Sequence, residues 1–179
     1  MMGRVATHLV FLRSVNVGKR AYPMAELRAV VEGAGYADVA THIQTGNLRL
    51  GSQRSAAELT AALEPLLEAD RGFEVPVVVM SPEQLVAVVE DASALAEDAV
   101  TRQYVELLRA APETEDVPVI EAQSRAGQRF VVRGRAVHLL LEDVSFHEVK
   151  AAPAAVRRAM GVSTNRNRTV LEAIAAKWC

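Results

Sequence analysis

A basic, glycine-containing loop follows the first apolar run of the chain. The run stops at Arg13, and Pro23 begins a helical pattern shortly afterwards. A strand, a loop with cations and a helix N-terminus together favour anion binding, because backbone N–H groups and positive charge both attract anionic oxygens. We expect a phosphate-bearing ligand to be bound here, by Arg13, Asn16, Gly18, Lys19 and Arg20. The alternative is a solvated loop in which Asn16 and Gly18 serve only as turn residues.

A second pair of cations lies near the C-terminus. The segment Thr164–Arg168 predicts the start of the last helix and places Arg166 and Arg168 in its first turn. Positive charge there opposes the helix dipole by about 0.5 kcal/mol per residue. An external anion or a carboxylate of this chain (Glu142, Asp143 or Glu172) would offset that cost. We expect Arg166 and Arg168 to approach the same cleft as the Arg13 loop and to bind the same ligand.

The segment Gln44–Asn47 has the composition of a tight turn. It could present an amide, a hydroxyl and a glycine to a ligand, but a hairpin turn is the more common role of such a sequence. We expect the first and third strands to be parallel neighbours. That arrangement places this turn at the opposite end of the sheet from Arg13, about 20 Å away. The two motifs would then not form one small site within a single domain.

Composition narrows the function classes. The chain has 179 residues, 50% of them apolar, and a formal net charge of −2, so it has no global attraction to nucleic acid or anionic membranes. No apolar run approaches the ~18 residues of a membrane span, and the beginning of the sequence does not resemble a signal peptide. The only cysteine, Cys179, excludes an intrachain disulfide. We expect a cytoplasmic protein that does not contact the membrane.

The remaining reactive side chains give weaker signals. The four histidines lack metal-ligand spacing, so we expect no metal and no cofactor. Glu142, Asp143, His147 and Glu148 could support acid–base chemistry, but a capping box formed by Ser145 and Glu148 explains part of this cluster. The arginines of the segment 125–135 could contact RNA. With only 4% aromatic residues for stacking, a solvated basic strand edge is favoured. No catalytic residue is identified.

The order of elements in the first half predicts an α+β fold. Strands are expected at 7–12, 39–43, 48–50 and 75–80, and helices at 23–33 and 55–70. Ser55 and Glu58 form a capping box, and Pro76 favours an edge position for the last strand. This β-α-β-β-α-β order is that of a ferredoxin-like unit, which we expect over residues 1–80.

The second half, residues 81–179, is expected to be a smaller α+β domain. A helix at 82–90 is followed by an acidic, alanine-rich segment that could cross between domains. Strands are expected at 103–108 and 118–122, and residues 129–141 form a hairpin. A helix at 153–160 and the C-terminal helix complete it. No internal sequence repeat is visible.

The N-terminal motifs resemble those of a widespread bacterial family of unknown function, DUF 1697. The residues that match its pattern are Leu12, Arg13, Val15, Asn16, Val17, Gly18, Pro23, Met24, Leu27, Gly35, Val39, Thr41, Ile43, Gln44, Gly46 and Asn47. A C-terminal signature is approximated by Thr164, Arg166, Asn167, Arg168, Thr169 and Val170. The resemblance implies two ferredoxin-like units and implies no activity.

Three function classes therefore stay open. The leading expectation is a binder of a small anionic ligand. The others are an enzyme of unknown reaction with a site between the two domains, and a structural or oligomeric interaction module. Nucleic acid and a second copy of the chain stay open as partners.

Overall fold

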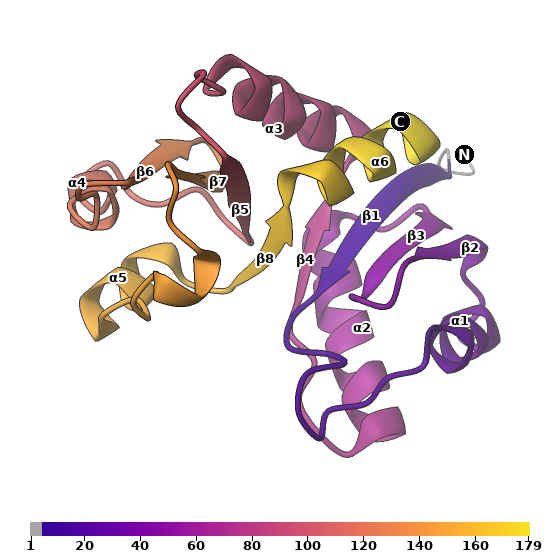
Figure 1. The fold of residues 1–179 in the computed structure, drawn as a ribbon. Coiled ribbons are helices and arrows are strands. Elements are labelled where there is room, and N and C mark those ends of the chain that lie inside the picture. The colour runs from indigo at the N-terminus through magenta and orange to yellow at the C-terminus, as the bar shows by residue number, and fades with distance from the viewer. Residues whose placement is uncertain (1–4) are drawn as a thin grey trace. The chain divides into compact units, whose positions relative to one another are not determined.

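The computed structural model describes residues 5–179 and contains two four-stranded antiparallel sheets with helices (Figure 1). The chain divides into two compact units. Unit 1 comprises the residues up to Gln84 together with Trp178–Cys179, and unit 2 comprises Leu85–Lys177. The α+β fold class is confirmed.

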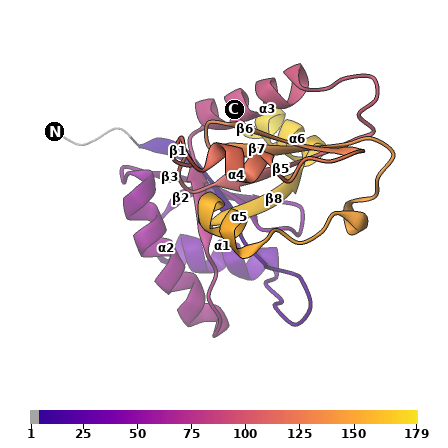
Figure 2. The same cartoon turned by 90° about the vertical axis from the view of Figure 1, so that its left-hand side faces the viewer.

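Unit 1 has the ferredoxin-like order. Its elements are β1 (Ala6–Leu12), α1 (Met24–Gly33), β2 (Ala37–His42), β3 (Asn47–Ser52), α2 (Ala56–Arg71) and β4 (Val77–Met80). The strand order is β2-β3-β1-β4, with β4 at the edge as Pro76 predicts. Both helices cover the same face of this sheet (Figure 2).

A local signal explains where α2 begins. Ser55 Oγ accepts a hydrogen bond from the Glu58 N–H at 3.3 Å, and the Ser55 N–H donates to the Glu58 carboxylate at 2.7 Å. This capping box satisfies donors that the first turn of α2 leaves free. Spacings of four residues then place Leu59, Leu63 and Leu67 on one face, and all three are buried. Burial of one such side chain contributes about 2 kcal/mol, which fixes α2 on the sheet.

The expected parallel pairing of the first and third strands is wrong. β1 and β3 are antiparallel, with Phe11 opposite Asn47. The crossover through α1 makes β2 parallel to β1, and the hairpin reverses the chain before β3 inserts between them. The Leu12 N–H therefore donates to the Gly46 carbonyl at 2.8 Å. The Arg13 loop and the Gln44–Asn47 turn consequently lie at the same end of the sheet.

Unit 2 contains a second sheet with the order β6-β7-β5-β8. Its elements are α3 (Pro82–Ala94, which begins at the end of unit 1), β5 (Arg102–Leu108), α4 (Val117–Glu121), β6 (Gln128–Arg133), β7 (Ala136–Leu141), the 3₁₀ turn η1 (Phe146–Glu148), α5 (Ala154–Met160), β8 (Ser163–Asn167) and α6 (Arg168–Trp178). The predicted hairpin is present as β6 and β7.

Three local predictions in this half are wrong. The segment 118–122 is not a strand but lies mostly in the short helix α4, where Pro118 occupies the first turn and Ile120 is buried. The segment from Ser163 to Asn167 is a strand, so the last helix begins at Arg168 and not at Thr164. The side-chain oxygen of Asn167 accepts from the Thr169 N–H at 2.9 Å. Finally, α3 continues beyond residue 90 to Ala94.

The two sheets share a backbone frame that the sequence did not reveal as a repeat. At the end of β1, the Leu12 N–H donates to the carbonyl of Gly46, the residue before β3. The Arg13 N–H donates to the carbonyl of Pro76, the residue before β4, at 2.9 Å. At the end of β5, Leu108 N–H donates to the Arg135 carbonyl before β7 at 2.8 Å, and Arg109 N–H donates to Val162 at 2.9 Å. These matching bonds align Leu12 with Leu108 and allow residue-by-residue comparison of the units.

Candidate functional site

The loop after β1 and the turn before β3 form one structure, which we name the loop cluster (residues 13–22 and 43–46). Asn16 joins its two parts. Its side-chain nitrogen donates to the Tyr22 carbonyl at 3.0 Å and to the Gln44 carbonyl at 2.6 Å, and its oxygen accepts from the Tyr22 N–H at 2.8 Å. These bonds use the amide of Asn16, so its role here is to position the loop.

Arg20 is also used within the fold. Its Nε donates to the Ser14 carbonyl at 2.8 Å, and its terminal nitrogen donates to the Glu74 carbonyl. The guanidinium lies 4.4 Å from the centre of the Phe73 ring, a favourable cation–π distance. Arg20 therefore ties the loop cluster to the segment between α2 and β4.

Gly46 locks the turn against the loop. Its φ of +75° lies in the left-handed region, and a Cβ atom there would lie 2.6 Å from Val15 Cγ2 and 2.8 Å from Leu12 Cβ. Only glycine fits both the conformation and the space. The turn and the loop are thus packed together as well as hydrogen-bonded.

The groups that face outward are those an anion needs. Arg13 and Lys19 are exposed, and the structure of residues 5–179 shows no ion pair or hydrogen bond for either side chain. The N–H groups of Val17, Gly18 and Lys19 likewise have no acceptor among the described residues. Gly18 has φ +57°, so the backbone is open to close approach at this point.

The loop cluster also carries exposed apolar groups on an unusual backbone. The exposed fractions are 55% for Val17 and 45% for Ile43. Ile43 has φ +49°, a conformation that is rare and strained for a β-branched residue. Such strain gathers at functional sites, because the surrounding structure must hold it in place.

The two C-terminal arginines lie in unit 2, and Arg166 is not in a helix. It lies in β8 and is buried, with one terminal nitrogen donating to Thr164 Oγ1 at 2.9 Å and to the Asn165 carbonyl at 2.7 Å. Burial lowers the pKa of Arg166 to about 10, and the Glu106 carboxylate acts in the opposite direction. The expected position in the first turn of the last helix is therefore wrong for this residue.

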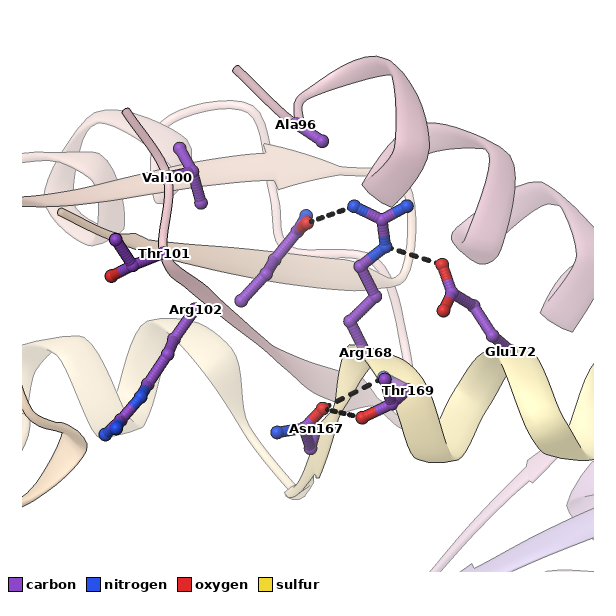
Figure 3. Close-up of a pocket in the computed structure, with 9 residues that line it drawn as sticks. Ala96, Val100, Thr101, Arg102, Asn167, Arg168, Thr169 and Glu172 are labelled. Carbon is purple, nitrogen blue, oxygen red and sulfur yellow. Dashed lines mark hydrogen bonds and ion pairs between the residues drawn. The ribbon is translucent and has the colours of Figure 1, made fainter. Parts of the chain in front are cut away.

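Arg168 begins α6 and is neutralised from within the chain. Its Nε donates to the Glu172 carboxylate at 2.6 Å, one helical turn further on (Figure 3). Its terminal nitrogens approach Gln103 Oε1 at 3.4 Å and Ser93 Oγ at 3.3 Å. Of the candidate counter-charges, Glu172 is the one found. The pair borders a polar cavity of about 310 Å³ that Arg102 also lines. The Arg13 loop belongs to unit 1, whereas Arg166 and Arg168 belong to unit 2. The expectation that they share one cleft therefore stays a prediction.

Acid–base and metal chemistry find little support among the described residues. Ser145 N–H donates to the Glu148 carboxylate at 2.8 Å, so the predicted cap accounts for that part of the acidic cluster. Across residues 5–179 no group of three histidine, cysteine or acidic side chains could hold a metal ion. His138 is buried, and that burial lowers its pKa to about 4 against the opposing effect of Asp91. Such a histidine is neutral at physiological pH.

Sequence reasoning missed one cavity. It lies against the α5 side of the second sheet and has a volume of about 310 Å³. Its lining is mostly apolar, but it includes Glu106 and Asn165, whose side chains are joined by a 3.2 Å hydrogen bond. A carboxylate within the apolar run of β5 was the sequence signal that could have found it.

No helix in the described part of the chain is long and apolar enough to cross a membrane. The search of curated proteins found no match. One solved structure, of a conserved bacterial protein SP0830 from Streptococcus pneumoniae, is similar with a TM-score of 0.80 and 20% identity, over 97% of this chain and 98% of that one. This likeness shows a shared fold. The model of the family described as "protein of unknown function (DUF1697)" matches residues 5–138, and the chain therefore belongs to that family.

Proposed function

We propose that the loop cluster binds a small phosphate-bearing anion. The observation that carries this proposal is that some polar groups of the loop cluster are used within the fold and others are exposed. Asn16 and Arg20 are used to fix the backbone, whereas Arg13, Lys19 and nearby N–H groups are left exposed. The backbone N–H groups of residues 17–19 belong to a loop that these bonds hold in place, so they lose little conformational entropy on binding, which favours affinity.

The surroundings favour a ligand with an apolar part next to its phosphate. Val17 and Ile43 expose apolar surface on the two halves of the loop cluster, and the Asn16–Gln44 hydrogen bond holds those halves together. The Gln44 side chain is exposed and offers a further amide. Phenyl phosphate combines both features and is a suitable probe.

The test is a titration of the full chain with phenyl phosphate, inorganic phosphate and phenol, followed by amide chemical shifts. We expect both phosphates to perturb residues 13–19 and phenol to have little effect on those residues. Affinity for phenyl phosphate should fall as salt is added, because exposed charges are screened over about 8 Å at physiological ionic strength.

A matched pair of variants makes the test specific. The double variant Arg13→Ala/Lys19→Ala should weaken phenyl phosphate binding by about tenfold or more, since each charge-assisted hydrogen bond is worth over 1 kcal/mol. The control, Arg133→Ala/Arg158→Ala, removes the same charge from exposed positions in unit 2 that do not line a cavity, and it should leave affinity unchanged. The proposal fails if neither phosphate binds, or if both double variants weaken binding equally.

The exposed Val17 and Ile43 also favour a competing function, an interaction module. Sedimentation of the full chain at rising concentration separates the two. Self-association that is lost in Val17→Ser/Ile43→Ser and is indifferent to phosphate supports the interaction module. A monomer at all concentrations supports the small-ligand site.

A further inference from the structure

Unit 2 contains a cavity with an apolar wall and a polar floor, distinct from the loop cluster. We propose that this cavity is a binding site for a small organic amine, which places its nitrogen donor against Glu106 and its apolar body against the surrounding rings. The volume of about 310 Å³ is within the range of small-molecule sites. Four observations support this assignment.

The first is the thinness of the helical layer. On the corresponding face of unit 1, α1 has 10 residues and α2 has 16, and their leucines fill the space over the sheet. In unit 2 the corresponding helices, α4 and α5, have 5 and 7 residues. The same sheet geometry with shorter helices leaves a space that the side chains do not close.

The second observation is that two polar side chains, those of Glu106 and Asn165, form the floor of that space. The shared backbone frame aligns Glu106 of β5 with Val10 of β1, and Asn165 of β8 with Val79 of β4. Val10 and Val79 belong to the buried core of unit 1. Two core valines of one unit are thus replaced by a carboxylate and an amide in the other, at the place where the cavity lies. Polar groups at a floor of this kind cost stability unless they gain partners, and a ligand would provide them.

The third is the hydrogen-bonding character of the floor. Asn165 Nδ2 donates to Glu106 Oε1 at 3.2 Å. The second carboxylate oxygen and the Asn165 Oδ1 atom have no partner among the described residues. Both are acceptors, so the complementary ligand group is a nitrogen donor such as an ammonium. Arg166 moderates the charge of Glu106, while one of its terminal nitrogens is used by Thr164 and by the Asn165 carbonyl.

The fourth is the wall. Phe130, Leu139, Phe146 and Met160 contribute apolar surface to the cavity. The Phe146 ring lies 4.3 Å from the Tyr104 ring, measured between centres, so one wall is held by aromatic contact. Lys150 lines the rim and is exposed, which leaves its ammonium group in water. An apolar body with one donor end matches this arrangement.

The test uses three probes of one shape: phenethylamine, 2-phenylethanol and 3-phenylpropionate. Each is titrated into the full chain, and amide chemical shifts are followed. We expect phenethylamine to bind about tenfold more tightly than 2-phenylethanol, because its hydrogen bond to Glu106 is charge-assisted. The propionate should bind most weakly. The shifts should map to β5, β7 and α5, and Arg13→Ala/Lys19→Ala should leave them unchanged.

Two variants decide the assignment. Glu106→Gln keeps the shape of the floor, and it should bring the affinities for the amine and the alcohol to within about twofold while 2-phenylethanol still binds. Ala152→Phe, at the cavity wall, should exclude all three probes while Glu106 stays in place. The proposal is overturned if no probe binds the folded wild-type chain, if Glu106→Gln keeps the amine preference, or if the shifts map elsewhere.

Discussion

The two units build the same sheet and cover it differently. In each, the first strand ends at a leucine that is followed by an arginine, and the N–H groups of this pair donate to the carbonyls of the residues before the third and fourth strands. Beneath that common frame, unit 1 has a closed layer of long helices, and unit 2 has short helices and a cavity. Polar residues at two strand positions and shorter helices thus distinguish the mostly apolar cavity of unit 2, with its polar floor, from the packed core of unit 1.

The units differ again at the turn before the third strand. In unit 1 the last turn residue is Gly46, which packs on Val15 without a side chain of its own. In unit 2 the same position is Arg135, whose Nε donates to the Leu108 carbonyl at 3.1 Å. Partial burial lowers the pKa of Arg135. A side chain therefore adds a hydrogen bond at this end of unit 2, whereas in unit 1 the same turn position packs on the loop through a residue that has no side chain.

The largest effect should come from adding a methyl group at Gly46. Gly46→Ala places a Cβ 2.6 Å from Val15 and imposes a left-handed conformation on alanine. Strain and overpacking together should lower the free energy of unfolding by about 4 kcal/mol. Urea unfolding of the full chain measures the loss.

The matched control for that change is Gly134→Ala in the other unit. Gly134 has φ +51°, but no atom lies within 4 Å of the position that an added Cβ would take. Only the backbone cost remains, about 1 kcal/mol. Equal losses in the two variants would show that the contact between turn and loop in unit 1 does not matter.

A pH effect of nearly the same size should arise from His138. This residue aligns with the half-buried Arg49 of unit 1, and its own ring nitrogens find no partner among the described residues. Its folded pKa of about 4 lies below the ordinary histidine value of 6.5, so the unfolded state takes up a proton first as pH falls. Stability from the neutral ring is complete above pH 6.5 and should decrease by about 3 kcal/mol towards pH 4.

Other carboxylates also titrate in acid, so the relevant quantity is the difference between variants. His138→Leu should flatten the fall in unfolding free energy between pH 6.5 and 4. His147→Gln, at an exposed position, should retain it. A wild-type slope in His138→Leu would contradict the assignment.

A double-mutant cycle tests the polar substitutions of unit 2 directly. Glu106→Val alone introduces the residue type that unit 1 has at the aligned position, Val10. It also removes a carboxylate that stabilises the charge of buried Arg166. We expect a loss of about 2 kcal/mol. Adding Arg166→Met, which restores the counterpart Met80, should recover stability to within about 1 kcal/mol of wild type, because apolar packing often replaces buried charges without loss.

Thermal unfolding with calorimetry measures each corner of the cycle. Strictly additive effects of the two changes would show that Glu106 and Arg166 do not interact.

The smallest effect concerns the two capping segments that follow the third strand of each unit. Ser55→Ala removes the acceptor for the Glu58 N–H at the start of a 16-residue helix and should cost about 1 kcal/mol. At Ser145 the backbone N–H donates to Glu148, and the element that follows is a single 3₁₀ turn. Ser145→Ala should therefore cost less than half as much. Chemical denaturation of both variants in one buffer gives the ratio.

Elements with local signals could be predicted from the sequence. Pro23, the capping box of Ser55 and the hairpin around Gly134 each depend on residues close together in the chain, and all three are in the structure. Elements whose state is decided by tertiary packing were missed. The β-branched segment around Pro118 is typical of a strand, yet it is helical because Ile120 is buried in that geometry. β8 is polar and has no apolar alternation to announce it.

The candidate site was found in part. The Arg13 loop was identified, but the wrong strand direction separated it from the Gln44 turn that it contacts. The structural roles of Asn16 and Arg20 depend on partners distant in sequence, such as Glu74, and no local pattern reveals them. The cavity of unit 2 could not be predicted for a similar reason. It lies where the short helices α4 and α5 leave part of the sheet uncovered. Besides the family resemblance, the sequence carries a Leu-Arg pair at the end of the first strand of each unit and a Ser-x-x-Glu motif after the third strand, and these short motifs are too common to indicate a repeat.

The start of β4 carries a safeguard against unwanted association. Pro76 offers no N–H, and the N–H of Val77 donates to the Glu64 carboxylate of α2 at 3.0 Å. An approaching strand, whether from a misfolded copy or a nascent chain, would find no free donor at either residue with which to begin pairing. A strand that began to pair at this point would first have to displace the Glu64 side chain of α2 from the Val77 N–H.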